Sequence, residues 1–301
     1  MDIADVALAV VVVVAASVAT SLAFGPSKGR RGRRGREAFE ESDEPHIGGA
    51  DEPHIAGSVE PHIEGAGGLD VEPRTVNGYT VYEIRNALDA AECASLVDYS
   101  RKKGVAHSRV WRKEPAVVGA GEVGAGSVGA GSVGADKDAE PPGEKLDESS
   151  RRSRQAWIGD DEHPAARKMA ALAARLTGID AVHQEALQVA VYEPQGMFVD
   201  HYDACPTMAD DPDNCDRMNQ GAGQRRATLL VYLNDGFAGG ETEFVKIGLK
   251  IRPERGKGIL FWDTDGDENI IASSMHRGNP VLSGEKWIAT KWTHKRPWVG
   301  K

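Results

Sequence analysis

The 301-residue sequence predicts a mainly β fold with flanking helices, in which a double-stranded β-helix (jelly roll) core is packed by N-terminal helices. Two observations carry this prediction. Before Gly178, two segments repeat their apolar residues at helical spacing. After Gly178 the apolar period changes to two, and Gly, Pro and Asn-Asp separate many short segments. That pattern is typical of an all-β sandwich or barrel, here preceded by two helices.

Both predicted helices have recognisable ends. The first lies in ALDAAECASLVDYSRKKG, where Asp89 and Glu92, three residues apart, form a capping-box pattern and Gly104 ends the helix. The second lies in HPAARKMAALAARLTG, with Pro164 in its first turn and Gly178 as its stop.

Strand-like segments follow the second helix. They are rich in β-branched and aromatic residues and are short enough for a sandwich. We expect strands at Leu187–Tyr192, Met197–Tyr202, Ala227–Leu233, Thr242–Val245, Leu249–Ile251, Gly258–Trp262, Met275–Arg277 and Trp287–Thr293. Their number fits an eight-strand jelly roll.

An apolar segment stands near the start of the chain. Val6–Phe24 carries no charge, and nineteen helical residues span about 28 Å, close to the thickness of a bilayer core. The basic residues that usually begin a secretory signal are absent, and Asp2 and Asp5 stand there instead. We therefore expect residues 1–24 to be an uncleaved signal anchor. A cleaved signal peptide is the alternative, because SLA at 21–23 is an acceptable cleavage site.

Residues 25–70 are expected to form a disordered linker, because they are rich in Gly, Glu, Pro and Arg. Its basic cluster, KGRRGRRGR at Lys28–Arg36, is interpreted as the flank of the membrane segment. The tetrapeptide EPHI recurs with a period of eight residues from Glu44, Glu52 and Glu60. We interpret it as a drifting tandem repeat, with weak metal binding by its histidines as the alternative.

The folded domain is expected over residues 71–301, interrupted by a Gly-rich insertion at about 115–148. Within that insertion a five-residue repeat runs from Gly119 to Val133, and glycine at this density cannot sustain a helix or pack a strand.

Charge and cysteine content narrow the function classes. With 36 Lys and Arg against 46 Asp and Glu, the net charge is −10, which argues against a nucleic-acid binder. Of the three cysteines, Cys93 falls in the first helix and is expected in the core. Cys205 and Cys215 bracket a short loop, and the sequence leaves open whether they pair in an oxidising compartment or remain free thiols.

Two residues of types that can ligate a metal lie close together on one predicted strand segment. His201 and Asp203 have the same parity, so their side chains are expected on the same face. His276 lies on a short strand of its own and supplies a third ligand. Two histidines and one carboxylate on one face of an octahedral ion leave three positions open, as in non-haem Fe(II) oxygenases. Zinc is the alternative metal.

Lys286 lies ten residues beyond His276, on the last predicted strand. A cosubstrate such as 2-oxoglutarate needs a fixed cation for its far carboxylate, and an ammonium buried on a rigid strand would otherwise be an unpaired charge. We therefore interpret Lys286 as the partner of that carboxylate.

Five ordered motifs resemble the catalytic domain of the prolyl 4-hydroxylase alpha subunit, a 2-oxoglutarate- and Fe(II)-dependent dioxygenase. They are LQVAVYEPQGMFVDHYDA, QRRATLLVYLND, GGETEF, GKGILFW and HRGNPVLSGEKWIATKWTH. The resemblance covers about Tyr79 to His294 and is strongest from Leu187 onward.

The resemblance implies roles for the individual residues of the site. The iron ligands would be His201, Asp203 and His276, and Lys286 would pair with the C5 carboxylate of 2-oxoglutarate. Further residues of the site would be Tyr192, Thr242 and Trp292 around the cosubstrate and Arg226 facing the peptide substrate. Phe198 departs from the pattern, because many members carry a tyrosine there that touches the substrate.

The implied activity is peptidyl-proline 4-hydroxylation, like that of a procollagen-proline 4-dioxygenase. It would use Fe(II), O₂, 2-oxoglutarate and L-ascorbate (vitamin C) and give 4-hydroxyproline, succinate and CO₂. A proline-rich peptide in polyproline II form suits such a groove, since its conformation is already fixed. The alternatives are a 2-oxoglutarate dioxygenase acting on another substrate, and a non-catalytic jelly-roll binding module.

The expected location is the endoplasmic reticulum membrane or the secretory pathway, with the domain in the lumen. Positive-inside reasoning on the Arg-rich flank points to the cytosolic side instead, so the orientation stays open. We expect no nucleic-acid partner, and the sequence identifies no partner subunit.

Overall fold

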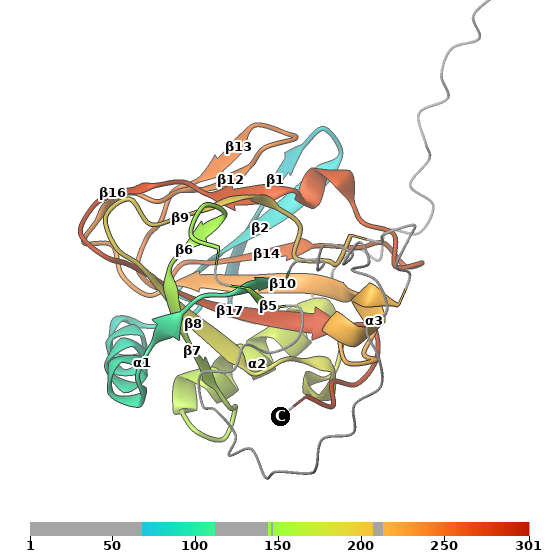
Figure 1. The fold of residues 1–301 in the computed structure, drawn as a ribbon, viewed down its shortest axis with the longest axis horizontal. Helices are drawn as coiled ribbons and strands as arrows, with labels where there is room; N and C mark the ends of the chain where they lie inside the picture. Colours follow the sequence, from blue (N-terminus) through green and yellow to red (C-terminus); the bar gives the residue numbers. More distant parts are fainter. Residues whose placement is uncertain (1–67, 112–143, 146, 207–212, 301) are drawn as a thin grey trace, which may run out of the picture. The chain divides into compact units, whose positions relative to one another are not determined.

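The computed structural model describes residues 68–111, 144–145, 147–206 and 213–300, all of which lie in one compact unit, His54–Lys301 (Figure 1). The predicted signal segment, the EPHI linker and residues 115–143 of the Gly-rich insertion fall outside these ranges. Within the described ranges, no helix is long and apolar enough to cross a membrane.

Two antiparallel sheets build the domain. The larger contains, in spatial order, β1 (Asp70–Val76), β2 (Tyr79–Arg85), β14 (Gly258–Trp262), β10 (Arg225–Tyr232), β17 (Lys286–His294), β8 (Leu187–Tyr192), β7 (Arg154–Ile158) and β3 (Ala106–His107). The smaller contains β13 (Leu249–Ile251), β12 (Thr242–Phe244), β15 (His276–Gly278), β9 (Met197–His201) and β6 (Arg151–Arg152). Two short pairs complete the described strands: β4 (Val110–Trp111) with β5 (Glu144–Lys145), and β11 (Ala238–Gly239) with β16 (Val281–Ser283).

The predicted jelly-roll core is confirmed. The eight predicted strands correspond to β8, β9, β10, β12, β13, β14, β15 and β17, and four of them fall in each sheet. Several ends differ: β9 stops at His201 rather than Tyr202, because the chain bends there, and β15 covers His276–Gly278 rather than 275–277.

Strands before residue 187 were missed. The β1–β2 hairpin turns at Asn77-Gly78, whose φ angles are 50° and 76°, and this dipeptide is the signal that would have identified it. By contrast β3 to β6 have two residues each, and β5 lies at the end of the predicted flexible insertion, while the five-residue β7 was missed as well. Two-residue strands carry no periodicity, so only pairing with a neighbour defines them.

Three α-helices are described: α1 (Ala90–Lys103), α2 (Pro164–Thr177) and α3 (Asn214–Met218). The predicted capping box of α1 is present, with Asp89 and Glu92 exchanging two hydrogen bonds of 2.8 Å. The α2 helix begins with Pro164 and ends at Gly178, whose left-handed φ of 69° a residue with a Cβ rarely adopts. Single turns of 3₁₀ helix lie at Ala181–His183 and Ala272–Ser274.

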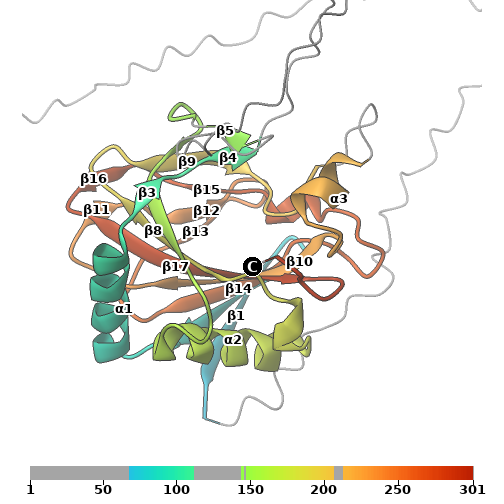
Figure 2. The same ribbon diagram turned by 60° about the horizontal axis from the view of Figure 1, so that its bottom comes forward.

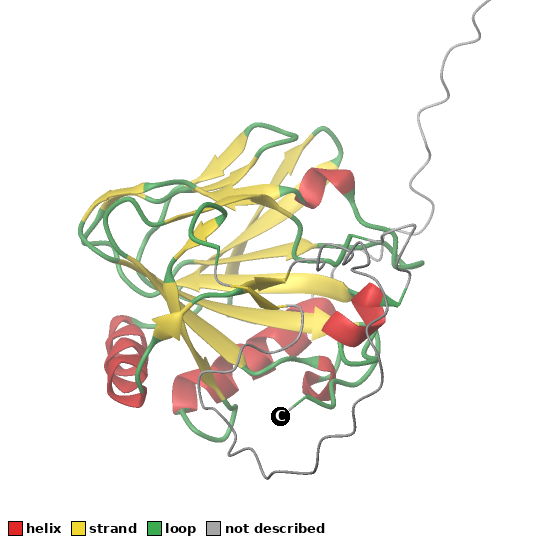
Figure 3. Cartoon of the chain, in the orientation of Figure 1, coloured by secondary structure: helices red, strands yellow, loops and turns green. Residues whose placement is uncertain are grey.

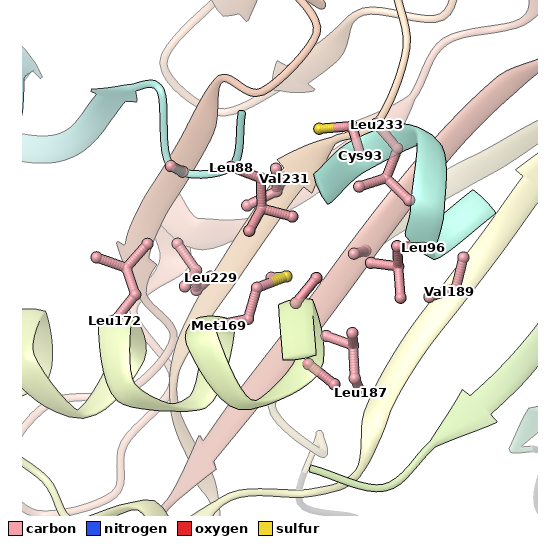
Figure 4. Packing of buried hydrophobic residues seen from close by; sticks show 14 of the residues in the cluster. Leu88, Cys93, Leu96, Met169, Leu172, Leu187, Val189, Leu229, Val231 and Leu233 are labelled. Atoms are coloured by element: carbon pink, nitrogen blue, oxygen red, sulfur yellow. The ribbon is translucent and has the colours of Figure 1, made fainter. Parts of the chain in front are cut away.

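The central strands of the larger sheet are buried on both faces, and Figures 2 and 3 show the helices on one side of this sheet and the smaller sheet on the other. On one face, Val189 and Val231 pack against α1 and α2, where Cys93 is buried as predicted (Figure 4). On the other face, Ala190 and Tyr232 pack toward the smaller sheet. This explains why β8 and β10 are nearly continuous apolar runs rather than alternating ones. The space between the two sheets is where the candidate site lies.

Candidate metal centre

His201 and His276 are direct cross-strand partners on β9 and β15. Asp203 lies just beyond the end of β9 rather than within it. The bend nevertheless returns its carboxylate to the histidines, at 3.7 Å (Oδ1) from His201 Nε2 and 3.8 Å (Oδ2) from His276 Nε2. One ligand atom from each of the three residues lies within 4.8 Å of the others. The three residues chosen from sequence thus lie together, although strand pairing places His276 and the bend after β9 places Asp203.

Both imidazoles are held with Nε2 toward this centre. His201 Nδ1 lies 2.7 Å from the Val199 carbonyl and His276 Nδ1 lies 2.9 Å from the Ser274 carbonyl, so Nδ1 carries the hydrogen and Nε2 keeps its lone pair. The Phe198 ring stacks on His201 at 3.5 Å between centroids. Burial, reinforced by the neighbouring His276, lowers the pKa of His201 to about 3 and keeps it neutral. Neutral imidazole nitrogens and a carboxylate are a donor set that fits Fe(II) or zinc.

Asp203 is buried and ionised. Burial disfavours its charge, but electrostatic attraction from the neighbouring imidazoles of His276 and His201 and from the Arg225 guanidinium outweighs burial and lowers the pKa of Asp203 to about 2. The Thr228 hydroxyl lies 2.8 Å from Oδ2, and Arg225 donates to the Asp203 backbone carbonyl at 3.3 Å. The carboxylate is therefore available as an anionic ligand at neutral pH.

Lys286 is only 2% exposed and lies opposite Tyr192 in the β17–β8 register. Among the described residues, no carboxylate oxygen lies within 4.0 Å of its Nζ, which sits 5.4 Å from the Tyr192 ring and 5.7 Å from the Tyr232 ring. Burial lowers the pKa of Lys286 to about 8, partly opposed by Glu241. An ammonium buried without a counter-ion marks a place for an anion.

The other predicted cosubstrate residues surround the same pocket. Tyr192, Thr242 and Trp292 line it together with the three metal ligands and Lys286. Thr242 accepts a hydrogen bond from the Tyr232 hydroxyl at 2.7 Å, which fixes its side chain. Trp292 lies under the Arg225 guanidinium, at 3.9 Å from the ring centroid.

Arg226 does not line this pocket. Its guanidinium donates to the Thr264 carbonyl at 3.0 Å and lies over Trp262, 5.6 Å from the ring centroid. A register irregularity between Arg225 and Ala227 interrupts the alternation of β10, and Arg225 rather than Arg226 reaches Asp203 and Trp292. A substrate role for Arg226 remains a prediction.

Arg151 and Gln188, two of the polar residues in the pocket wall, were not predicted from the sequence. Arg151 lies on β6, pairs with Gln188 through a 2.8 Å hydrogen bond and covers the Phe198 ring at 4.8 Å. Both Arg151 and Gln188 line the pocket. Arg151 belongs to a two-residue strand, so no periodic signal could have found it.

A buried ionic network behind Arg225 was also missed. Glu185 accepts from Arg225 at 2.5 Å, and its carboxylate lies 2.8 Å from His294 Nε2. The other ring nitrogen of His294 lies 2.9 Å from the Gly223 carbonyl. This network fixes the guanidinium that holds Asp203 and covers Trp292.

A disulfide joins Cys205 and Cys215, which decides the alternative that the sequence left open. It closes the loop that begins two residues after Asp203. The Gln224 side chain accepts a hydrogen bond from the Cys205 N–H at 2.9 Å and donates one to the Cys205 carbonyl at 2.8 Å. The first residue of the loop is therefore held next to the start of β10.

A larger surface cavity of about 380 Å³ lies elsewhere, between α1 and the start of β17. Its wall includes Arg101, Arg255 and Trp287, but none of the three metal ligands. The chemistry-bearing residues therefore belong to the smaller pocket between the sheets.

Known proteins resemble this part of the chain. Residues 187–294 match the family model described as 2OG-Fe(II) oxygenase superfamily. Prolyl 4-hydroxylase subunit alpha-1 of Bos taurus and that of Homo sapiens are each 34% identical over 144 residues, which is 48% of this chain and 26% of theirs. The chain thus spans about a quarter of the length of these relatives. A crystal structure of the viral collagen prolyl hydroxylase from Paramecium Bursaria Chlorella virus-1, in complex with 2OG, also matches, with 27% sequence identity and a TM-score of 0.49. The match covers 73% of this chain and 98% of the viral one.

Proposed function

We propose that this chain, which carries a prolyl 4-hydroxylase-like 2OG-Fe(II) oxygenase domain over residues 187–294, is a peptidyl-proline 4-hydroxylase that uses Fe(II), O₂ and 2-oxoglutarate. One observation carries the proposal. Two imidazoles and one carboxylate converge in the same pocket as a buried ammonium that has no carboxylate partner among the described residues.

The residues present fit an iron ion. His201 and His276 would ligate it through Nε2 and Asp203 through a carboxylate oxygen, and the backbone carbonyls behind the two rings keep the imidazoles oriented. When bound, Fe(II) and 2-oxoglutarate supply the oxidation: O₂ converts 2-oxoglutarate to succinate and CO₂, and its second oxygen atom enters the substrate C–H bond. The chain holds and orients these groups and limits the access of water. As is typical of the family, we expect ascorbate to sustain turnover.

The cosubstrate fits between the metal ligands and Lys286. Its C5 carboxylate would pair with the ammonium, whose charge at pH 7 follows from a pKa of about 8. Tyr192 and Thr242 line the same pocket and define the walls for the carbon chain.

An aromatic surface beside the pocket supports a proline-rich peptide as substrate. Trp157 pairs with Gln188, which pairs with Thr290, so the three side chains share one face of the larger sheet. Gln188 and Thr290 line the pocket, while Trp157 is 40% exposed and lies 6.0 Å from Trp292. Exposed aromatic rings are the surfaces on which polyproline II peptides dock.

The disulfide supports a location in the secretory pathway. Cys205–Cys215 requires an oxidising compartment, such as the lumen of the endoplasmic reticulum. We propose that the domain lies in that lumen and that the apolar segment Val6–Phe24 attaches it to the membrane. Protease protection of the domain in sealed microsomes tests this orientation: digestion without detergent would contradict it. The proposal specifies no partner subunit.

The activity is tested with the full-length chain, Fe(II), 2-oxoglutarate and ascorbate. Succinate release is measured with and without a polyproline peptide, and the peptide is examined by mass spectrometry for the gain of one oxygen atom. We expect peptide-stimulated succinate and hydroxylated proline, both lost in His201→Ala and Lys286→Ala. Succinate without peptide hydroxylation would move the proposal to another substrate. Iron binding without any turnover would favour a non-catalytic binding module.

A further inference from the structure

A second buried carboxyl group lies behind the metal ligand Asp203. Asp263 follows β14 directly and is 0% exposed. Its backbone is fixed on both sides, since its N–H donates to the Arg226 carbonyl and its own carbonyl accepts from Ile271, each at 2.9 Å. The sequence reasoning assigned Asp263 no role.

The Thr228 hydroxyl connects the two carboxyl groups. Its Oγ1 lies 2.8 Å from Asp203 Oδ2 and 2.8 Å from Asp263 Oδ2. Thr228 itself is 1% exposed and is held in β10 between Phe261 on β14 and Trp292 on β17. The three side chains therefore form one hydrogen-bonded row that ends at the metal centre.

The number of hydrogens available in this row determines which groups donate and which accept. A hydroxyl donates one hydrogen bond and otherwise accepts, whereas an ionised carboxylate only accepts. With both carboxylates ionised, one of the two short contacts would lack a hydrogen. The row is complete when one carboxyl group is protonated and donates to Thr228, which then donates to the other.

The surroundings decide which carboxyl group holds the hydrogen. A carboxylate ligates a divalent metal in its ionised form, which assigns the hydrogen of the row to Asp263 rather than to Asp203. Burial, together with the nearby charge of Asp203, raises the pKa of Asp263 well above its usual value, although Thr228, Arg225 and Arg226 oppose this. In addition, Asp263 Oδ1 is buried without a hydrogen-bond partner in the described part of the chain, which a charged oxygen tolerates poorly.

We propose that Asp263, as a neutral carboxylic acid, is a positioning residue that acts through Thr228 on the metal ligand Asp203. Asp263 donates to Thr228 Oγ1, and Thr228 donates to Asp203 Oδ2. That hydrogen bond engages Oδ2 and leaves Oδ1 for the metal, so Asp203 binds through one oxygen and the positions needed by cosubstrate and O₂ stay open. The inference rests on the metal site of the proposed function but not on the identity of the substrate.

Metal affinity is the readout, because hydrogen bonds to a ligating carboxylate typically change it 10–100-fold. The metal-free, full-length chain is titrated with Mn(II), which substitutes for Fe(II) without oxidising, and the Kd is measured by calorimetry. Thr228→Val removes the hydroxyl at constant shape and is expected to weaken Mn(II) binding by about 10–100-fold, while Thr228→Ser retains it. An unchanged Kd in Thr228→Val would overturn the proposal.

Asp263→Asn distinguishes a neutral donor from a negative charge. Asparagine donates to Thr228 as the neutral acid does, so we expect Asp263→Asn to change the Kd by no more than about twofold, both in the parent protein and in the Thr228→Val background. A tenfold loss in both backgrounds would show that Asp263 acts as a charge, and would refute the inference. Asp265→Asn, on the same loop but outside the row, removes one negative charge as the matched control.

Infrared difference spectroscopy gives a second reading that needs no metal. The parent protein minus Asp263→Asn is expected to show the C=O band of a protonated carboxylic acid at pH 7. Carboxylate bands alone would contradict the proposal. Failure of the parent protein to bind Mn(II) would instead reject the metal site itself, so the two failures are distinguishable.

Discussion

Lys286→Met is expected to stabilise the metal-free protein while it abolishes cosubstrate binding. Methionine keeps the length of the side chain and removes the charge. Lys286 is 2% exposed and has no carboxylate within 4.0 Å among the described residues, so the variant leaves no buried partner unpaired. Both effects follow from the same buried ammonium.

The magnitude follows from the pKa. Burial lowers the pKa of Lys286 from 10.5 to about 8. At 1.36 kcal/mol per pKa unit, holding the charged form in the native state costs roughly 3 kcal/mol at pH 7. Between pH 8 and 10.5 the unfolded chain binds the proton and the native state does not, so the stability of the parent protein rises with pH across that window. The advantage of Lys286→Met is therefore largest below pH 8 and shrinks above it.

Urea unfolding of both proteins at pH 7 and at pH 9.5 measures this difference. Loss of 2-oxoglutarate binding is followed separately, and we expect the Kd to rise by roughly 100-fold or more, since a buried charge pair is worth about 2–5 kcal/mol. Lys257→Met is the matched control. Lys257 is also buried but lies 3.1 Å from Glu83, so its loss is expected to lower stability by leaving that carboxylate with Arg74 as its one remaining cation among the described residues, without affecting 2-oxoglutarate. A Lys286→Met protein less stable than the parent at pH 7, or an advantage independent of pH, would refute the reasoning.

Three further predictions concern the same domain. Because only the ammonium form of Lys286 pairs with a carboxylate, the Kd for 2-oxoglutarate is expected to rise about tenfold per pH unit above pH 8 in calorimetric titrations; a flat profile up to pH 9.5 would contradict this. Replacing both Cys205 and Cys215 with serine opens a loop of sequence separation 10, which by chain entropy lowers stability by about 2.5 kcal/mol in urea unfolding; equal midpoints would show that the loop is ordered without its crosslink. Trp157→Ala is expected to raise the KM for a polyproline peptide by roughly tenfold while the KM for 2-oxoglutarate stays constant, and a matching rise in both would place Trp157 in the fold rather than in the peptide groove.

Much of the fold could be predicted because the relevant signals are local. The capping box at Asp89 and the left-handed stop at Gly178 each depend on residues within one helical turn. Each core strand from residue 187 onward could be recognised by its own run of apolar, β-branched or aromatic residues. Of the strands missed before residue 187, β3 to β6 have only two residues and show no period, whereas β1 and β2 could have been found from the Asn77-Gly78 turn and β7 is long enough to show a period.

For the site, the sequence by itself determined which residues can ligate a metal, because His201 and Asp203 stand two positions apart at the end of a predicted strand and His276 lies on a strand of its own; the structure shows His276 to be the cross-strand partner of His201. Only the tertiary structure decided what surrounds them. Asp263 lies 60 residues from Asp203, and Thr228 joins the two only because β10 and β14 pair in one particular register. A one-residue slip would turn Thr228 to the opposite face of the sheet. The apolar period of a segment shows which of its residues are buried. What each residue is buried against depends on the register of strand pairing, which the whole sheet sets.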